Sequence, residues 1–185
     1  MPAEAHITPI WKKQKLFIAL FFTAIGLWFS YDGEFGYPLS NQRWEKHENL
    51  KKAGHLAEWP ALAKQMDWNE TPPEKFYHKA DIDVQFILGG LSLMIGAASF
   101  IFWTTQVKRV LKTDDEAVYA PGGKRVPFES ITRIDRKKWV SKGLATVVYS
   151  INGRRGKFIL DDYKFDRDPT HQIMAEIEEK RKKQE

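Results

Sequence analysis

Three histidines, His47, His55 and His78, share one polar stretch with several carboxylates, the combination of residue types that a metal site needs. No two of these histidines stand four residues apart, and no H-E-x-x-H pattern occurs. His78 and Asp81 are three residues apart on an expected helix, a spacing that is common by chance. We therefore predict no metal site and no cofactor.

Carboxylate pairs capable of acid–base chemistry occur at residues 114–115 and 161–162, and His171 is the nearest histidine in sequence to the second pair. Both pairs fall where turns are expected, so that a turn role is the simpler interpretation. The chain has no cysteine, and it contains no P-loop, no G-x-G-x-x-G and no G-x-S-x-G motif. These patterns predict a protein that is not an enzyme.

Basic residues gather around two expected turns in the C-terminal third of the chain, with one tryptophan beside them. We take them as candidates for binding anionic lipid or a protein partner, with Trp139 as the anchor of a protein interface. Ordinary positive-inside composition is the alternative explanation of the charges, and no nucleic-acid signature accompanies them. The candidates are Arg136, Lys137, Lys138, Trp139, Arg154, Arg155 and Lys157.

Two strongly apolar stretches lie upstream of these candidates, although the mean hydropathy of the whole chain is only -0.48. Residues 16–31 and residues 84–107 carry no charge and predict two transmembrane helices. A cleaved signal peptide is the alternative for the first stretch. Its exit, GLWFSYDG, lacks the small residues of a cleavage site, which favours an anchor.

The basic residues near the ends of these stretches predict the orientation. Six of them, Lys12, Lys13, Lys15, Lys108, Arg109 and Lys112, flank the outer ends of the pair. Three, Arg43, Lys75 and Lys79, flank the intervening loop. This bias predicts a multi-pass membrane protein with both termini in the cytoplasm, comprising an N-terminal segment 1–15, an extracytoplasmic loop 32–83 and a C-terminal domain 108–185.

Small residues give the second span a face that a neighbouring helix can approach closely, and Gly89, Ser92 and Gly96 are the expected contacts. We expect the two spans to pack on each other through this face, with homodimerisation as the alternative. Neither span contains an ionisable residue, which argues against an ion path or a proton relay within one copy.

The loop shows helix signals. A cap at Ser40 or Asn41 and a stop at Gly54 predict one helix, Pro60 predicts the start of a second, and Pro72-Pro73 predicts a third that runs into the second span. Five aromatics, Trp44, Trp59, Trp68, Phe76 and Tyr77, are expected to form the core of this small unit or to lie at the membrane interface, with ligand stacking as the alternative.

The C-terminal part changes to short alternating runs typical of an antiparallel sheet. Asn152-Gly153 between LATVVYSI and RRGKFIL predicts a hairpin with a type I′ turn. Asp168 and Pro169 are expected to begin a terminal helix whose apolar stripe is Ile173, Met174 and Ile177.

The segments RVPFESITRID and GLATVVYSING, followed by that helix and placed behind a membrane span, resemble the bacterial pleckstrin-homology-like domain family over about residues 107 to 180. The resemblance implies a bent antiparallel sheet or partial barrel closed by one helix, and it implies no catalytic residues. The whole chain also resembles uncharacterised two-span bacterial membrane proteins with a WP-containing loop, and this resemblance implies the bacterial cytoplasmic (inner) membrane as its location.

The function predicted from these features is that of a non-catalytic, membrane-anchored binding or scaffolding protein, whose sheet domain docks a protein partner or the anionic membrane surface. An accessory subunit of a membrane transporter or envelope enzyme complex is the competing class. An enzyme with a site in the aromatic loop is the third.

Overall fold

The computed structural model describes residues 2–183, which form two compact units. Residues 2–17 and 100–183 make up the sheet unit, and Ile18–Ser99 makes up the helical unit. The helices are α1 (Pro9–Tyr31), α2 (Tyr37–Ala53), α3 (Trp59–Gln65), α4 (Lys79–Gln106), α5 (Trp139–Lys142) and α6 (Arg167–Lys182). The strands are β1 (Glu4–His6), β2 (Val110–Thr113), β3 (Ala117–Tyr119), β4 (Arg125–Pro127), β5 (Ile131–Lys138), β6 (Leu144–Ile151) and β7 (Arg154–Asp161).

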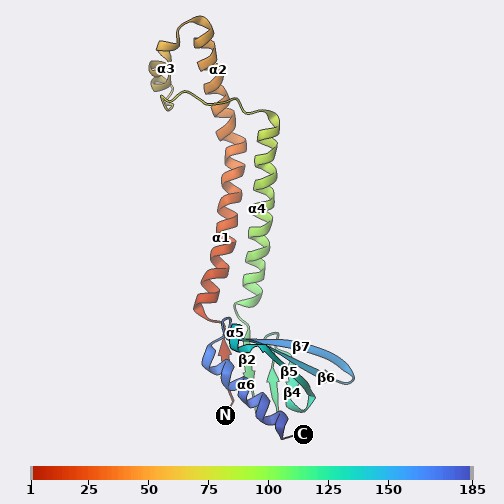
Figure 1. Cartoon of the computed structure of the whole chain (residues 1–185). Coiled ribbons are helices and arrows are strands. Elements are labelled where there is room, and N and C mark those ends of the chain that lie inside the picture. Colours follow the sequence, from red (N-terminus) through yellow and green to blue (C-terminus); the bar gives the residue numbers. More distant parts are fainter. Residues whose placement is uncertain (1, 184–185) are drawn as a thin grey trace. The chain divides into compact units, whose positions relative to one another are not determined.

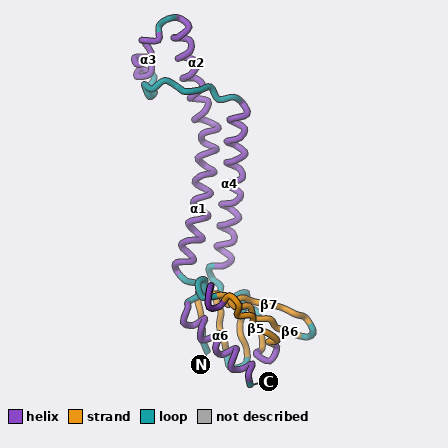
Figure 2. The backbone as a smooth tube through the Cα atoms, viewed as in Figure 1, coloured by secondary structure: helices purple, strands orange, loops and turns teal. Residues whose placement is uncertain are grey.

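Helices α1 and α4 run side by side in the helical unit (Figures 1 and 2), and small residues set how closely they pack. A Cβ placed on Gly26 would lie 2.9 Å from the backbone nitrogen of Leu93, and one on Gly96 would lie 3.0 Å from the backbone nitrogen of Thr23. Gly89 faces Ser30 in the same way. Two of the three residues expected at this packing face, Gly89 and Gly96, therefore lie against α1.

One helical path runs from α1 into α2 through a π-helical turn at Asp32–Gly36. Gly54 ends α2 as expected: its φ of 78° is left-handed, and its N–H donates to the carbonyls of Leu50 and Lys51. The helix expected after Pro72-Pro73 is absent, since no helix begins between these prolines and Lys79. The residue before a proline is biased away from helical dihedrals, which favours the extended form found here.

The aromatic side chains of the loop pack on one another. Trp59 is 2% exposed, contacts the rings of His47 and Trp68, and donates its indole N–H to the carbonyl of Glu70 at 2.7 Å. Asn41 holds the extended segment through both the N–H and the carbonyl of Tyr77, at 2.7 and 2.8 Å. These contacts agree with the prediction that the aromatics form a core.

The sheet unit contains two antiparallel sheets, with strand orders β1-β2-β3-β4 and β5-β6-β7. The sheets are not closed into a barrel. The structure therefore has two open sheets where a bent sheet or partial barrel was expected. The core joins Leu111 and Val126 of the first sheet to Val147 and Leu160 of the second, and Ile177 of α6 packs against them. Ile173 and Met174 are also buried, as expected from the stripe on α6.

Two local predictions can be compared with the backbone directly. Asn152 and Gly153 have φ values of 51° and 76°, which are the left-handed dihedrals that a type I′ turn requires. Helix α6 begins at Arg167 with Asp166 before it, two residues earlier than expected, and Pro169 lies within its first turn. A proline is tolerated there because the N–H groups of the first turn have no partner inside the helix.

Strand β1 belongs to the sheet unit although it precedes the first apolar helix. Ala5 stands opposite Leu111 and His6 opposite Val110, while Ile7 forms an isolated bridge with Phe165. From the sequence, residues 1–15 are expected to be a separate segment and the domain is expected to begin at residue 108. In the structure the sheet unit is discontinuous in sequence, because the whole helical pair is inserted between its first two strands.

Candidate functional site

The start of α1 and the end of α4 are fastened to each other within the sheet unit. The indole N–H of Trp103 donates to the carbonyl of Lys12 at 3.0 Å, and the Trp11 and Phe102 rings lie 6.2 Å apart. The hydroxyl of Tyr163, in the loop after β7, is hydrogen-bonded to the side chain of Gln14. The loop between β7 and α6 therefore lies beside the residues from which the helices depart.

Lys164 is the central cation of this joint. Its ammonium donates to Gln106 Oε1 at 2.7 Å and lies 5.0 Å from the centre of the Trp11 ring. Burial lowers the pKa of Lys164, and the neighbouring charges of Arg109 and Lys15 lower it further, against the opposite effect of Asp161. Burial is the main cause of this shift, and Arg109 is the neighbouring charge that adds most to it.

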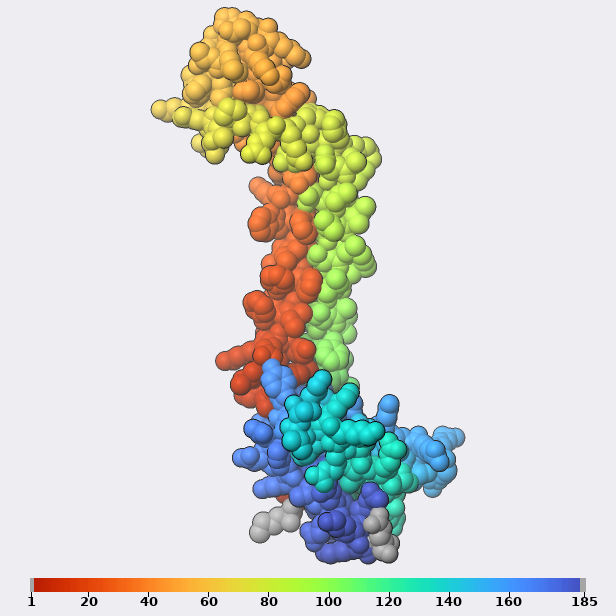
Figure 3. All heavy atoms as spheres, viewed as in Figure 1, coloured from red at the N-terminus to blue at the C-terminus, as the bar shows by residue number. Residues whose placement is uncertain are grey.

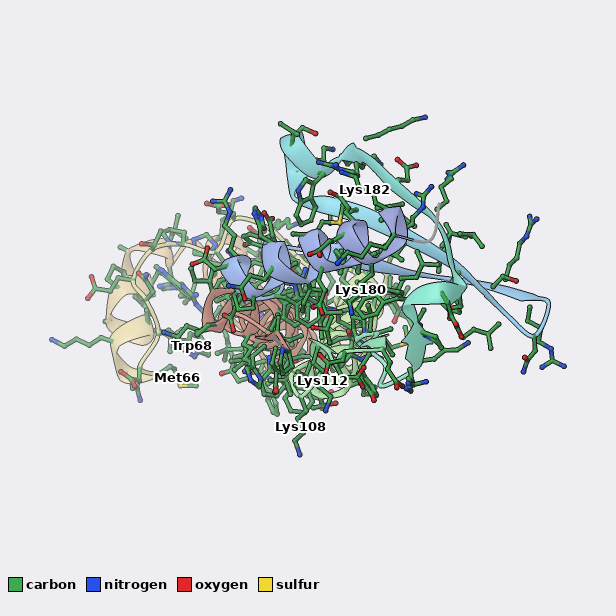
Figure 4. All side chains as sticks on the ribbon, turned by 90° about the horizontal axis from the view of Figure 1, so that it is seen from below. Met66, Trp68, Lys108, Lys112, Lys180 and Lys182 are labelled. Atoms are coloured by element: carbon green, nitrogen blue, oxygen red, sulfur yellow. The ribbon has the colours of Figure 1, made fainter. Side chains whose placement is uncertain are left out.

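An open hollow of about 540 Å³ lies at the end of α4. Its basic lining comes from Lys108, Arg109 and Lys112, and its other side is the turn between β3 and β4, including Gly122 and Gly123. Figure 4 shows Lys108 and Lys112 on one side of the unit, away from α6, which carries Lys180 and Lys182. In the sequence these three basic residues indicate only the orientation of the chain in a membrane.

The binding residues expected from the sequence do not form one patch. The β6–β7 pairing runs from Leu144 opposite Asp161 to Ile151 opposite Arg154, a separation of roughly 23 Å along the strands. Arg154, Arg155 and Lys157 lie towards the turn of this hairpin, which projects from the unit in Figure 3. Arg136, Lys137, Lys138 and Trp139 lie at the end of β5 and the start of α5, near the opposite end of the hairpin.

Two of these candidates are engaged within the fold. Arg136 forms an ion pair with Glu178 of α6 at 2.7 Å, which places its guanidinium between the sheet and the helix. Trp139 is partly buried against the core, and its ring lies 4.9 Å from that of His171. Replacement of Trp139 would therefore disturb packing as well as any interface.

The solvent face of the second sheet presents a basic and apolar surface, which we call the outer face. Val147 of β6 is buried in the core, so its neighbour Val148 points to the other side. Arg133 and Lys157 stand opposite Val148 on the two flanking strands. Because cross-strand partners share one face, the three side chains form a row across the sheet.

The next rows extend the outer face. Thr146 lies between Asp135 and Ile159, and Ser150 stands opposite Arg155. Ile159 is 51% exposed, and neither Arg155 nor Lys157 ion-pairs with a carboxylate in the described part of the chain. Arg133, by contrast, is paired with Asp135 of the same face at 3.6 Å, so the unpaired positive charge beside the apolar centre comes from β7. Apolar area beside unpaired positive charge is an arrangement that can bind an acidic partner.

The chain matches no protein-family model, and no curated protein or solved structure is significantly similar to it.

The carboxylates considered for catalysis have structural partners. Asp114 accepts hydrogen bonds from the backbone N–H groups of Glu116 and Ala117 and from the hydroxyl of Tyr119, which lowers its pKa. Asp162 accepts from His171 Nε2 at 2.8 Å and lies 3.5 Å from Arg167. These contacts hold turns and the start of α6, as the turn interpretation expected.

The loop histidines are likewise apart from one another. His55 contacts Glu58 at 2.9 Å, His47 stacks edge-on against Trp59, and the backbone N–H of His78 donates to Asp81. Within residues 2–183 no three histidine or acidic side chains lie close enough to hold a metal ion.

Lys164 and the hollow were missed because their parts are distant in sequence. Lys164 stands in a short turn with no pattern of its own, and its partners Trp11 and Gln106 lie at the ends of two different helices. The double glycine at 122–123 was interpreted only as a turn. The pairing of β1 with β2 and of β2 with β3 brings these segments together, with the bridge between Ile7 and Phe165.

Proposed function

We propose that this chain is a non-catalytic, membrane-anchored binding protein of the bacterial inner membrane, whose sheet unit docks a protein partner on the cytoplasmic side. Helices α1 and α4 are long and apolar enough to cross a membrane. Their 23 and 28 residues correspond to about 34 and 42 Å, against a hydrocarbon core of about 30 Å.

Exposed apolar side chains on both helices support this placement. Most of each apolar window is exposed, whereas a core helix of a soluble protein would be mostly buried. Lipid would solvate these side chains without the cost that water imposes. Large exposed residues of this kind include Phe17, Leu20, Phe21, Leu27 and Trp28 on α1, and Ile87, Leu91, Met94 and Ile101 on α4.

The sheet unit supports the resemblance to bacterial pleckstrin-homology-like domains. Seven antiparallel strands in two sheets are followed by one C-terminal helix, which is the order that the resemblance implies. Strand β1, which lies outside residues 108–185, is one of these strands and pairs with β2. We therefore propose a domain of this kind in which a pair of membrane helices is inserted after the first strand.

The observation that carries the docking proposal is the outer face of β5, β6 and β7, where the unpaired Lys157 lies beside Val148 and the exposed Ile159. A partner with an acidic rim and an apolar centre fits this surface. The membrane surface itself is the other candidate occupant of the outer face, because anionic lipids also attract basic clusters.

Site-specific crosslinking in intact cells tests the docking. A photoreactive residue at Thr146, in the middle of the outer face, should give a discrete protein product, and Arg155→Glu with Lys157→Glu should weaken it. The matched control is the same photoreactive residue at Glu129, an exposed position in the turn before β5. Equal products from both positions, or none from Thr146, would rule against a protein partner on this face.

The second candidate function is that of an accessory subunit of a larger membrane complex. Gly90 of α4 favours it, because a Cβ there would meet no other part of the described chain within 4 Å, apart from its chain neighbours and the helix's own backbone. A helix of another protein could approach α4 closely at this point. Co-purification of a stoichiometric large membrane protein, lost in Gly90→Leu, would support this function over docking by the sheet unit.

A further inference from the structure

Seven basic side chains surround the ends of α1 and α4 within the sheet unit, and none of them ion-pairs with a carboxylate of residues 2–183. This set, which we call the basic collar, consists of Lys12, Lys13, Lys15, Lys108, Arg109, Lys112 and Lys164. By contrast, Arg136 of β5 is ion-paired with Glu178 at 2.7 Å. The collar therefore carries positive charge that the protein itself does not neutralise.

The hollow at the end of α4 gives part of this collar a defined shape. Lys108 and Arg109 are the first charged residues after the uncharged stretch that ends at Val107, so they stand where a span meets the headgroup layer. Lys112 is held 5.2 Å from the centre of the Tyr119 ring, which also lines the hollow. Three cations thus line one cavity instead of being spread over a convex surface.

The donors in this hollow suit a phosphate group. Arg109 uses its Nε to donate to the carbonyl of Thr105 at 3.2 Å, which orients the guanidinium and leaves its terminal nitrogens for a ligand. The opposite wall is the turn at Gly122-Gly123, and a Cβ at either glycine would meet nothing within 4 Å. A ligand can therefore approach the backbone of this turn without steric obstruction.

Lys164 lies outside the hollow, and its electrostatic environment also favours an anion near Arg109. Arg109 is the like charge that most strongly disfavours the charged form of Lys164, after burial itself. An anion bound at Arg109 would offset this repulsion.

We infer that the hollow lined by Lys108, Arg109 and Lys112 binds the phosphate of an anionic lipid headgroup. The lipid chains would lie along the exposed apolar surface of the helices, which is what favours a lipid over free phosphate as the source of the anion. This inference rests on the membrane placement proposed above but not on docking at the outer face. Extraction of membranes at alkaline pH tests the placement separately, because a chain without spans would be released.

Native mass spectrometry of the full-length protein in mild detergent tests the site. Added phosphatidylglycerol should remain bound as a one-to-one adduct, while zwitterionic phosphatidylcholine should bind far more weakly. The variant Lys108→Gln, Arg109→Gln, Lys112→Gln should lose phosphatidylglycerol affinity by about 100-fold, as expected from three basic groups near one anion. The matched control, Arg154→Gln, Arg155→Gln, Lys157→Gln, removes the same charge at the far end of the hairpin and should retain the adduct.

Other outcomes would overturn the inference. Equal losses in the two triple variants would place lipid binding outside the hollow. Equal retention of phosphatidylcholine would remove the requirement for an anion, and full competition by inorganic phosphate at millimolar concentration would identify free phosphate as the ligand. Circular dichroism checks the folding of each variant. If the triple variant unfolds, Lys108→Gln alone serves in its place, because it breaks no hydrogen bond or ion pair within residues 2–183. This single variant should still weaken the adduct several-fold.

Discussion

Removal of β1 should unfold the sheet unit even though all its other strands are retained. We compare residues 108–185 alone with a linked fragment in which residues 2–8 are joined to residue 108 by a short Gly-Ser linker. Ala5 and Leu111 are neighbours on adjacent antiparallel strands, so a short linker can replace the helical pair between them. Both fragments lack the apolar helices and can be studied in water.

The expected loss follows from the contacts of β1. Ile7 is 2% exposed, and burial of such a side chain stabilises the fold by about 2 kcal/mol. Three backbone hydrogen bonds to the carbonyls of Ala3, His6 and Lys164 also disappear, at about 1 kcal/mol each. The sum of about 5 kcal/mol compares with a total stability of about 5 to 15 kcal/mol for an ordinary domain. Residues 108–185 alone should therefore be largely unfolded or only marginally stable.

Urea unfolding followed by circular dichroism measures this difference, and the linked fragment should give a cooperative transition. Within the linked fragment, Ile7→Ala should lower the free energy of unfolding by about 2 to 4 kcal/mol. Ile159→Ala, at a half-exposed position of β7, is the matched control and should change it by much less. Equal midpoints and slopes for the two fragments would show that β1 is only an attachment and not part of the fold.

Three further predictions concern single residues. Gly96→Ile should separate α1 from α4 and lower the thermal stability of the full chain in detergent, whereas Gly90→Ile, which meets open space, should not. Gly153→Val should destabilise the linked fragment by about 1 to 3 kcal/mol because its φ of 76° is costly for a branched residue, while Gly122→Val, in open space without a positive φ, should be tolerated. Asp114→Asn should lower stability at neutral pH, and the difference from the parent should vanish in a pH titration of unfolding as the pH falls through the lowered pKa of this carboxyl, because the stabilising charged form exists only above it.

Local sequence signals predicted the elements whose causes are local. The hairpin followed from Asn152-Gly153, since few residues other than Asn and Gly accept left-handed dihedrals in succession. The two apolar helices followed from uncharged length alone, and the end of α2 followed from Gly54. In each case the structure is decided by interactions between residues close in sequence, or between side chains and the surrounding solvent.

The sequence could not predict elements that depend on distant partners. Strand β1 has three residues and no turn beside it, and it exists because Leu111 and Phe165 offer a place for Ala5 and Ile7. Trp139 was predicted as the anchor of a protein interface, which stays a prediction, but its contact with the ring of His171, 32 residues further along the chain, could not be read from the sequence. The candidate binding residues were grouped by turn, whereas strand register decides which of them share a face.

The pairing of β1 with β2 also constrains how the chain can cross a membrane. Only two residues connect β1 to α1, and only three connect α4 to β2, so the outer ends of both helices are held at the same sheet. If α4 crosses the membrane, α1 must cross it too, because a chain that crossed once would separate strands that are hydrogen-bonded neighbours. Cleavage after the first apolar stretch would remove β1 and expose Leu111 and Phe165, which are buried in the intact fold. The fold thus favours an uncleaved first span for a reason that is independent of the residues at the cleavage position, and intact N-terminal peptides in the mature protein are the corresponding observation.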